Sequence, residues 1–97
     1  MACYIVSRLK VTDPQGMRQY QQDFPPLVES FGGKYLVRGG PVEALEGSWD
    51  HDRLVIMEFP SKEAAQAWYH SAAYRPFIEL RRHFADADIL MADAIDG

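Results

Sequence analysis

The strand-forming segments of this chain carry apolar side chains on both faces, and this feature limits its possible folds most strongly. In segment 53–59, one face carries Val55 and Met57, and the other carries Leu54 and Ile56. Successive residues of a strand point to opposite faces. A sheet that helices cover on one side normally presents polar residues on the other. The pattern therefore predicts a sheet whose two faces both need a cover.

Strand and helix signals follow one another in the order β-α-β-β-α-β, with the second helical region split in two. Strands are predicted from alternation, and helices from apolar residues three or four positions apart. The expected elements are strands 3–11, 34–38, 53–59 and 88–94, and helices from Pro14 to residue 31, from Ser61 onward, and from Ala73-Tyr74 to Asp86-Ala87. This order predicts one α+β domain over residues 1–97, a ferredoxin-like sandwich of four antiparallel strands with helices on one face.

Proline and glycine mark the places where these elements are expected to bend or end. Pro25-Pro26 lies inside the first helix, and we expect a kink or break there because proline lacks the backbone donor and crowds the preceding turn. Gly32 is expected to end that helix. Gly39-Gly40-Pro41 is expected to interrupt the second strand as a bulge or turn. Pairing is expected to continue over residues 42–46.

The uncovered face of the predicted sheet points to a partner. A large exposed apolar surface usually marks an interface or a ligand groove. The simplest cover is a second copy of the chain, packed sheet against sheet about a twofold axis. The alternative is that the loop 39–52 folds over the open face. A homodimer is therefore expected.

Composition and charge exclude several classes of protein. Lys and Arg total 10 against 14 Asp and Glu, which gives a net charge of −4 and argues against nucleic-acid binding. The N-terminal residues do not resemble a secretory signal, and the apolar runs are too short for a membrane span. The lone Cys3 suits a reducing compartment and is expected to fill space in a strand. A cytoplasmic protein without membrane contact is expected.

Several segments together resemble the bacterial domain of unknown function 1330. These are Gly32-Gly33-Lys34-Tyr35-Leu36-Val37-Arg38-Gly39-Gly40, Leu45-Glu46-Gly47-Ser48-Trp49, Arg53-Leu54-Val55-Ile56-Met57-Glu58-Phe59-Pro60-Ser61, and Ala67-Trp68-Tyr69-His70-Ser71 with Tyr74 and Arg81. The similarity covers essentially the whole chain. It implies a member of the dimeric α+β barrel superfamily, in which two ferredoxin-like sheets pair. It implies no established activity.

Arg38 and Glu58 are the first candidates for chemistry, because each ends an otherwise apolar strand. A buried Glu58 would act as a general base, and Arg38 would hold a carboxylate or enolate oxygen. The alternative is a structural Arg–Glu pair. Tyr35 and Arg38 lie on opposite faces of a regular strand, so they share a site only if a bulge at Gly39-Gly40 realigns them.

Aromatic side chains are candidates for the wall of a ligand pocket. Tyr4, Tyr35 and Trp49 would supply a wall or a phenol donor, and Tyr69 would face a cleft mouth or the dimer seam. Tyr74 is the last candidate, and it shares a helix face with a residue seven positions later, Arg81. That arginine is expected to bond the loop after the second strand or the last helical carbonyls, rather than a phosphate.

No metal or cofactor is expected. Asp50-His51-Asp52 has three neighbouring polar side chains, but consecutive residues do not easily converge on one ion. His70 and His83 are expected to be surface residues or to have satisfied partners. Gly39-Gly40-Pro41 lacks the Lys-Ser/Thr of a phosphate-binding loop.

Two functions from different classes fit these observations. The first is a small homodimeric protein that binds a small organic molecule. The second is a cofactor-free enzyme, an isomerase, lyase or monooxygenase, with Glu58 as base and Arg38 as anion clamp. The discriminating observation is a pocket that both residues and the tyrosines line.

Overall fold

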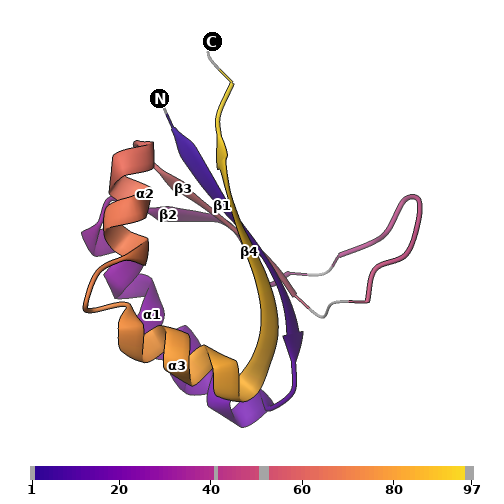
Figure 1. Cartoon of the computed structure of the whole chain (residues 1–97). Helices are drawn as coiled ribbons and strands as arrows, with labels where there is room; N and C mark the ends of the chain where they lie inside the picture. Colours follow the sequence, from indigo (N-terminus) through magenta and orange to yellow (C-terminus); the bar gives the residue numbers. More distant parts are fainter. Residues whose placement is uncertain (1, 41, 51–52, 96–97) are drawn as a thin grey trace.

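A four-stranded antiparallel sheet carries helices on one face in the computed structural model (Figure 1), which describes residues 2–40, 42–50 and 53–95. The strands have the order β2-β3-β1-β4 across the sheet. The elements in chain order are β1 (Cys3–Val11), α1 (Pro14–Ser30), β2 (Lys34–Arg38), β3 (Arg53–Phe59), α2 (Lys62–Tyr69), α3 (Arg75–Phe84) and β4 (Ala85–Asp93). The expected α+β architecture is confirmed.

The two faces of β1 differ in burial as strand alternation predicts. Cys3, Ile5 and Leu9 are buried beneath the helices. Ile5 lies opposite Met57 of β3 on one side and Met91 of β4 on the other, so this face continues across the central strands. The intervening residues, Val6 among them, point to the open face.

The helix α1 runs through its two prolines without a break. Asp13 caps its first turn by accepting a hydrogen bond from the backbone N–H of Gln15 at 3.2 Å. The break expected at Pro25-Pro26 is not present, because the helix continues to Ser30. Gly32 follows the helix with a φ of 83°, which favours glycine.

The chain leaves the sheet after Arg38, and this corrects the expectation of further pairing. Residues 42–46 form no strand and are exposed. Gly39 has a φ of 73°, in the left-handed region, and it turns the chain away after its N–H donates to the Leu54 carbonyl oxygen at 2.8 Å.

The last strand begins earlier than the sequence predicted. α3 ends at Phe84 rather than at Asp86-Ala87, and β4 starts at Ala85 rather than at Asp88. The reason is that β1 extends to Val11, which pairs with Ala85. The backbone N–H of Thr12 also donates to the Phe84 carbonyl oxygen at 2.6 Å and fixes this helix end.

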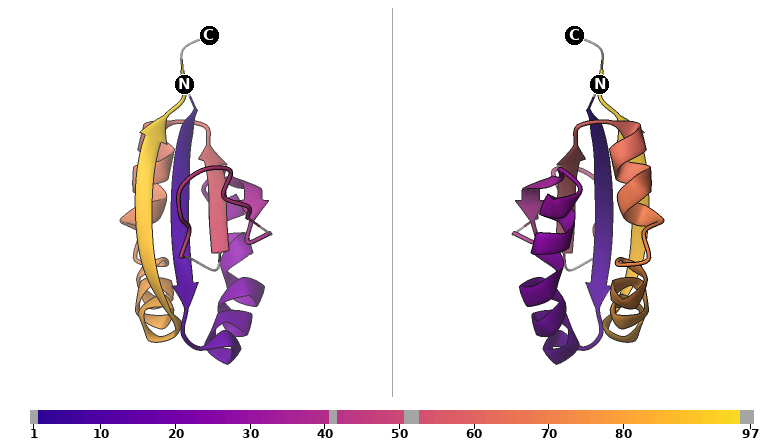
Figure 2. Two further views of the ribbon diagram at one scale, coloured as in Figure 1. Left: turned by 90° about the vertical axis from the view of Figure 1, so that its right-hand side faces the viewer. Right: turned by 90° about the vertical axis from the view of Figure 1, so that its left-hand side faces the viewer.

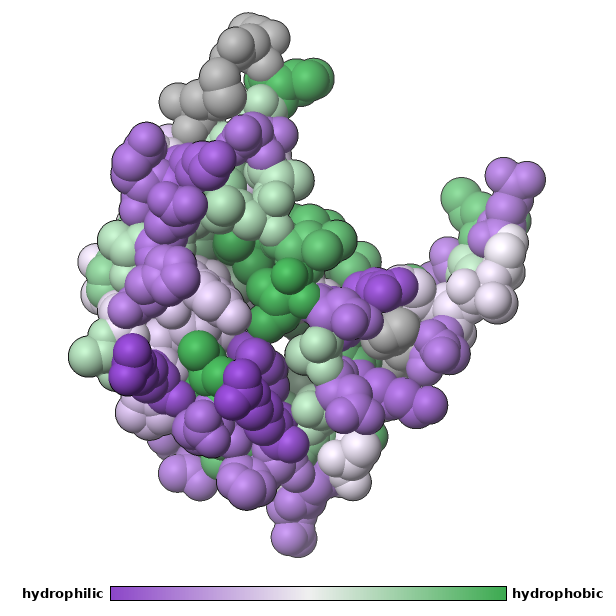
Figure 3. All heavy atoms as spheres, viewed as in Figure 1, coloured by the Kyte–Doolittle hydropathy of each residue, from purple (hydrophilic) through white to green (hydrophobic). Residues whose placement is uncertain are grey.

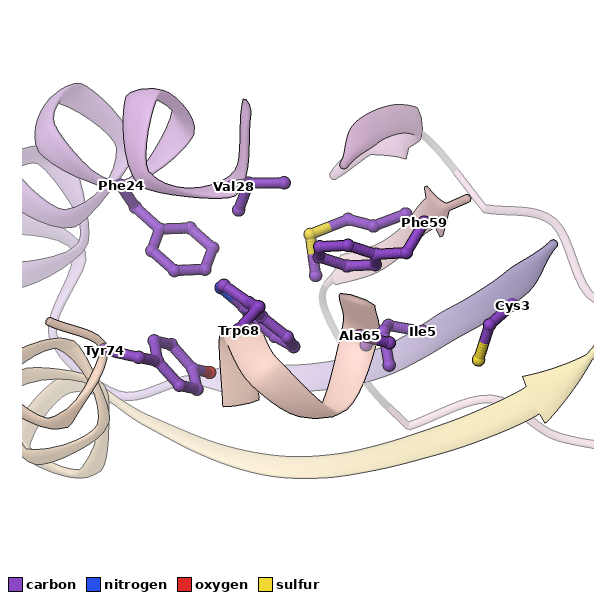
Figure 4. Packing of buried hydrophobic residues seen from close by; sticks show 9 residues of the cluster. Cys3, Ile5, Phe24, Val28, Phe59, Ala65, Trp68 and Tyr74 are labelled. Carbon is purple, nitrogen blue, oxygen red and sulfur yellow. The ribbon is translucent and has the colours of Figure 1, made fainter. Parts of the chain in front are cut away.

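Aromatic rings dominate the core between the sheet and the helices. Phe24, Phe59, Trp68 and Tyr74 are each no more than 3% exposed and pack against one another (Figure 4). Such rings supply large apolar areas at favourable offset or tilted angles. Trp68 contacts the other three rings, and the group therefore ties α1, α2 and the segment before α3 to the sheet.

The far face of the sheet has no helical cover. Leu90, which lies opposite Val6 on this face, is 62% exposed. The loop 42–50 stands off this side of the sheet instead of lying against it (Figures 1 and 2). Its residue Leu45 is 91% exposed. The described part of the loop does not fold over the open face.

Candidate functional site

A cavity of about 50 Å³ lies between the sheet and the helices. One water needs roughly 10–15 Å³ of such space, so a few waters or a small organic molecule would fit. Its walls are aromatic and aliphatic, with two arginines, a glutamine and a serine among them. The lining residues are Ser7, Leu9, Met17, Tyr20, Gln21, Phe24, Tyr35, Arg38, Gly39, Val55, Met57, Tyr74, Arg81 and Ile89.

A bulge in β2 brings Tyr35 and Arg38 to the same cavity. Tyr35 lies opposite Met57 and Arg38 opposite Val55, and the register shifts between Tyr35 and Val37. The extra residue reverses the alternation, so both side chains face the helices. The Arg38 guanidinium carbon lies 5.0 Å from the centre of the Tyr35 ring. The realignment that a shared site requires is present, but the bulge lies at residue 36 and not at Gly39-Gly40.

Arg38 is tied to the facing helix. Its Nη2 donates to the Gln21 carbonyl oxygen of α1 at 3.0 Å. A cation over a tyrosine ring is electrostatically attracted to the ring face. These two contacts hold an otherwise exposed side chain at the edge of the cavity.

Tyr20, Tyr74 and Arg81 form a buried hydrogen-bonded group in the cavity wall. Arg81 Nη1 donates to the Tyr74 hydroxyl oxygen at 2.6 Å, and the hydroxyls of Tyr20 and Tyr74 are hydrogen-bonded to each other. Tyr74 is 1% exposed and Arg81 is 8% exposed. Among the described residues, Arg81 thus bonds neither the loop nor the helical carbonyls that the sequence suggested. The spacing of seven residues between Tyr74 and Arg81, two helical turns, was the sequence signal that could have predicted this contact.

The three tyrosines of the cavity keep their protons at neutral pH. Burial raises the pKa of Tyr35 to about 12, although the Arg38 charge lowers it. Burial also raises the pKa of Tyr74 and carries that of Tyr20 well above the usual value. Each phenol is therefore a neutral group that can donate a hydrogen bond. Tyr20 also lines this cavity, and it was not among the candidate residues named from the sequence.

Glu58 lies on the other face of the sheet, away from Arg38. It is opposite Tyr4 of β1 and Lys34 of β2. The Lys34 Nζ lies 3.2 Å from Glu58 Oε1, and the carboxylate is partly buried, with 25% of the side chain exposed. Tyr4 and Glu58 therefore belong to the open face. Within one chain, the structure does not bring Glu58 and Arg38 together.

Trp49 and Tyr69 are also separate from the cavity. Trp49 lies in the loop 42–50 and is half-buried. Tyr69 lines a groove of about 280 Å³ between α2 and β4, seen as the apolar hollow in Figure 3. The lining of this groove is Ile5, Ala65, Gln66, Tyr69, His70, Ile89, Leu90 and Met91. Of the expected aromatic wall, only Tyr35 and Tyr74 line the cavity.

Metal-ligating groups do not cluster in the described ranges, where no set of three His, Cys, Asp or Glu side chains is placed to hold an ion. His51 and Asp52 of the Asp50-His51-Asp52 run lie outside those ranges. Burial raises the pKa of the Cys3 thiol, which disfavours its reactive thiolate. Across the part of the chain that the structure describes, none of the helices has the length and apolar character needed to cross a membrane.

Comparisons with known proteins place the chain in a family without an assigned activity. The family model described as domain of unknown function DUF1330 matches residues 2–95. A protein of unknown function from Rhodopseudomonas palustris, RPA0582, has a similar structure, with a TM-score of 0.78 and 19% sequence identity over 99% of this chain and 84% of its own. No curated protein matches the sequence.

Two more distant structures share the fold. SnoaB, a cofactor-independent oxygenase from Streptomyces nogalater, has a TM-score of 0.61 and 12% identity over 99% of this chain and 95% of its own. The de novo designed protein Foldit4 has a TM-score of 0.64 and 10% identity over 98% of this chain and 100% of its own. An enzyme and a designed protein on one fold illustrate that function is carried by sites rather than by folds.

Proposed function

This chain belongs to the DUF1330 family of domains of unknown function, and we propose that it binds a small organic molecule in the cavity between sheet and helices. The observation that carries the proposal is the convergence of Tyr35, Arg38, Tyr74 and Arg81 on one mostly apolar space. Ligand sites typically combine apolar walls with a few polar groups that orient the ligand. The cavity has this composition.

We further propose that the functional unit is a homodimer formed through the open sheet face. Leu90 is exposed there, and Val6, Ile56 and Val37, which follow it strand by strand across the sheet, are half-buried. A second copy would cover these residues by presenting the same surface about a twofold axis. The open face has the alternating apolar strands that this packing requires.

The geometry favours binding over the alternative enzyme. Catalysis by Glu58 as base with Arg38 as clamp requires the two groups in one site, and they lie on opposite faces of the sheet within a chain. SnoaB is a cofactor-independent oxygenase, but at 12% identity its likeness supports the fold alone. We therefore propose no reaction for Glu58.

Filling the cavity tests the binding proposal. Ser7 is 6% exposed and lines the cavity, so Ser7→Leu would occupy its space. A thermal-shift screen of small organic acids, amides and phenols should give stabilising compounds for the parent protein and none for Ser7→Leu. Gln19→Leu, at an exposed position of α1, is the matched control and should keep the response. Equal responses in parent and Ser7→Leu would refute a ligand in this cavity.

Light scattering coupled to size exclusion tests the dimer. The chain has a mass of 11.0 kDa, and we expect twice that value at micromolar concentration. Ile56→Lys would bury an unpaired charge in the proposed interface and should give the monomer mass. Gln22→Lys, on the exposed side of α1, should stay dimeric. A monomeric parent protein would refute the dimer and leave the binding proposal intact.

A further inference from the structure

Arg81 is a buried cation whose carboxylate partner is absent from the described residues. It is 8% exposed, and its one hydrogen bond there goes to the neutral Tyr74 hydroxyl. The other cations with ion pairs in those ranges, Arg8, Lys34 and Arg82, are much more exposed. An arginine keeps its charge in proteins, so burial without a counter-charge is unfavourable.

The end of α3 balances only part of this charge. Arg81 lies in the last turn of the helix, where the free carbonyls attract cations. The helix end supplies roughly half an elementary negative charge, spread over several carbonyl groups. The guanidinium also has five N–H donors in a planar fork, more than its bond to Tyr74 uses. An anion with two oxygens matches the remaining donors.

The rest of the cavity lining is also either positively charged or neutral. Its lining contains two arginines, and among the described residues that line it there is no Asp or Glu. Ser7 and the hydroxyls of Tyr20 and Tyr74 add neutral hydrogen-bonding groups. Tyr74 accepts from Arg81 and is bonded to Tyr20, and burial raises the pKa of both phenols, so neither carries a competing negative charge.

We propose that this cavity is a site for a small organic monoanion, a carboxylate whose oxygens are held by Arg81 with Tyr74 and whose short apolar part lies against Val55, Met57 and Ile89. The inference rests on the proposed binding function and specifies its ligand class. Arg38 stands at the edge of the same cavity and contributes positive potential there. The cavity volume of about 50 Å³ favours an acid of only a few heavy atoms.

Propionate and propionamide test the charge requirement, because they share a shape and differ in charge. Each is titrated into the isotope-labelled full chain to about 100 mM at constant ionic strength, a range that reveals dissociation constants above 1 mM. We expect propionate to shift the backbone signals of Ser7, Val55 and Arg81, and to bind at least about tenfold more tightly than propionamide. Equal binding would overturn the anion inference and leave cavity binding standing. If neither compound shifts these signals, the anion inference fails, and the Ser7→Leu screen then decides the binding proposal.

Arg81→Met tests the residue while keeping an apolar stem of similar length. We expect propionate binding to fall at least about tenfold and the Tm without ligand to stay equal or rise, because an unpaired buried charge is removed. Arg82→Met, the same change on the next and exposed residue of α3, should leave binding unchanged. A lowered Tm with unchanged propionate binding would show that Arg81 is structural and overturn the proposal.

Tyr74→Phe covers the case in which Arg81→Met does not fold. This change keeps the ring in the core and removes the hydroxyl that Arg81 contacts. Propionate should bind several-fold more weakly and propionamide should be unaffected. A variant that binds propionate as the parent does would remove Tyr74 from the site and contradict the proposed clamp.

Discussion

Arg38 donates to the carbonyl oxygen of Gln21 at 3.0 Å, and that carbonyl lacks its usual helical donor. In a helix the Gln21 carbonyl would accept from the N–H of residue 25, which is Pro25 and has none. The proline inside α1 therefore leaves an acceptor facing β2, and the guanidinium of Arg38 fills it. A local defect in the helix thus positions a cation at the cavity.

Replacing Pro25 should release Arg38 while strengthening α1. Pro25→Ala restores an N–H for the Gln21 carbonyl and removes the ring from the preceding turn. We expect the free energy of unfolding to rise by about 1–3 kcal/mol, as measured by urea denaturation. The Arg38 side chain should become more mobile, as measured by relaxation of its guanidinium NMR signals.

Pro26→Ala is the control for this prediction. It restores the corresponding bond to the Gln22 carbonyl and should also stabilise the helix, whereas the hydrogen bond of Arg38 in the described structure goes to Gln21. The Arg38 signals should not change. Equal mobility of Arg38 in the two variants would contradict the role assigned to Pro25.

The strand pattern was sufficient to predict the fold. Alternation along residues 3–11 and 53–59 divided the side chains between two faces, and the pairing of Ile5 with Met57 puts these two on one face. The boundary at Phe84 was missed because the carbonyl that ends α3 is held by Thr12, far away in sequence. Local signals do not report such a contact.

The site was predictable only in part. Arg38, Tyr35 and Tyr74 were named from residue type and position, and all three line the cavity. Glu58 was grouped with Arg38 because both end strands, but the extra residue at 36 in β2 turns Arg38 to the helix side. No residue type in the run 35–37 announces that bulge, since it arises from pairing with β3.

Gly33 is expected to tolerate no side chain. A Cβ at this position would lie 2.7 Å from Val28 Cγ1 and from Phe59 Cε1, both in the packed core. Gly33→Ala should lower the free energy of unfolding by about 1–3 kcal/mol, as overpacking typically does. Gly40→Ala, where the added Cβ meets nothing within 4 Å, should change stability little. Similar urea midpoints for the two variants would contradict the tight packing at Gly33.

The buried phenols predict a loss of stability at alkaline pH. The pKa of Tyr35 is raised from 10.0 to about 12, so its contribution is fully present below pH 10. Between these values the unfolded chain releases the proton and the folded chain retains it, and the free energy of unfolding falls as the pH rises. Tyr35→Phe cannot ionise, and its urea midpoint should fall less steeply above pH 10. An unchanged slope would show that Tyr35 titrates normally.

The Lys34–Glu58 pair distinguishes a free sheet face from a covered one. In a single chain the pair is partly solvated, with Lys34 67% exposed, and such pairs contribute about 0–1 kcal/mol. Glu58→Gln should then keep the fold and change the urea midpoint only slightly when the protein is dilute and monomeric.

In the proposed dimer the same change leaves the Lys34 ammonium buried without its partner, which costs far more. We therefore expect Glu58→Gln to reduce the free energy of dimerisation, measured by sedimentation equilibrium. This reduction should exceed the loss in the free energy of unfolding of the monomer. Glu79→Gln, which breaks the exposed pair with Arg82 on α3, should affect neither quantity appreciably. If Glu58→Gln leaves the dimerisation constant unchanged, the two protomers do not meet at this end of β3.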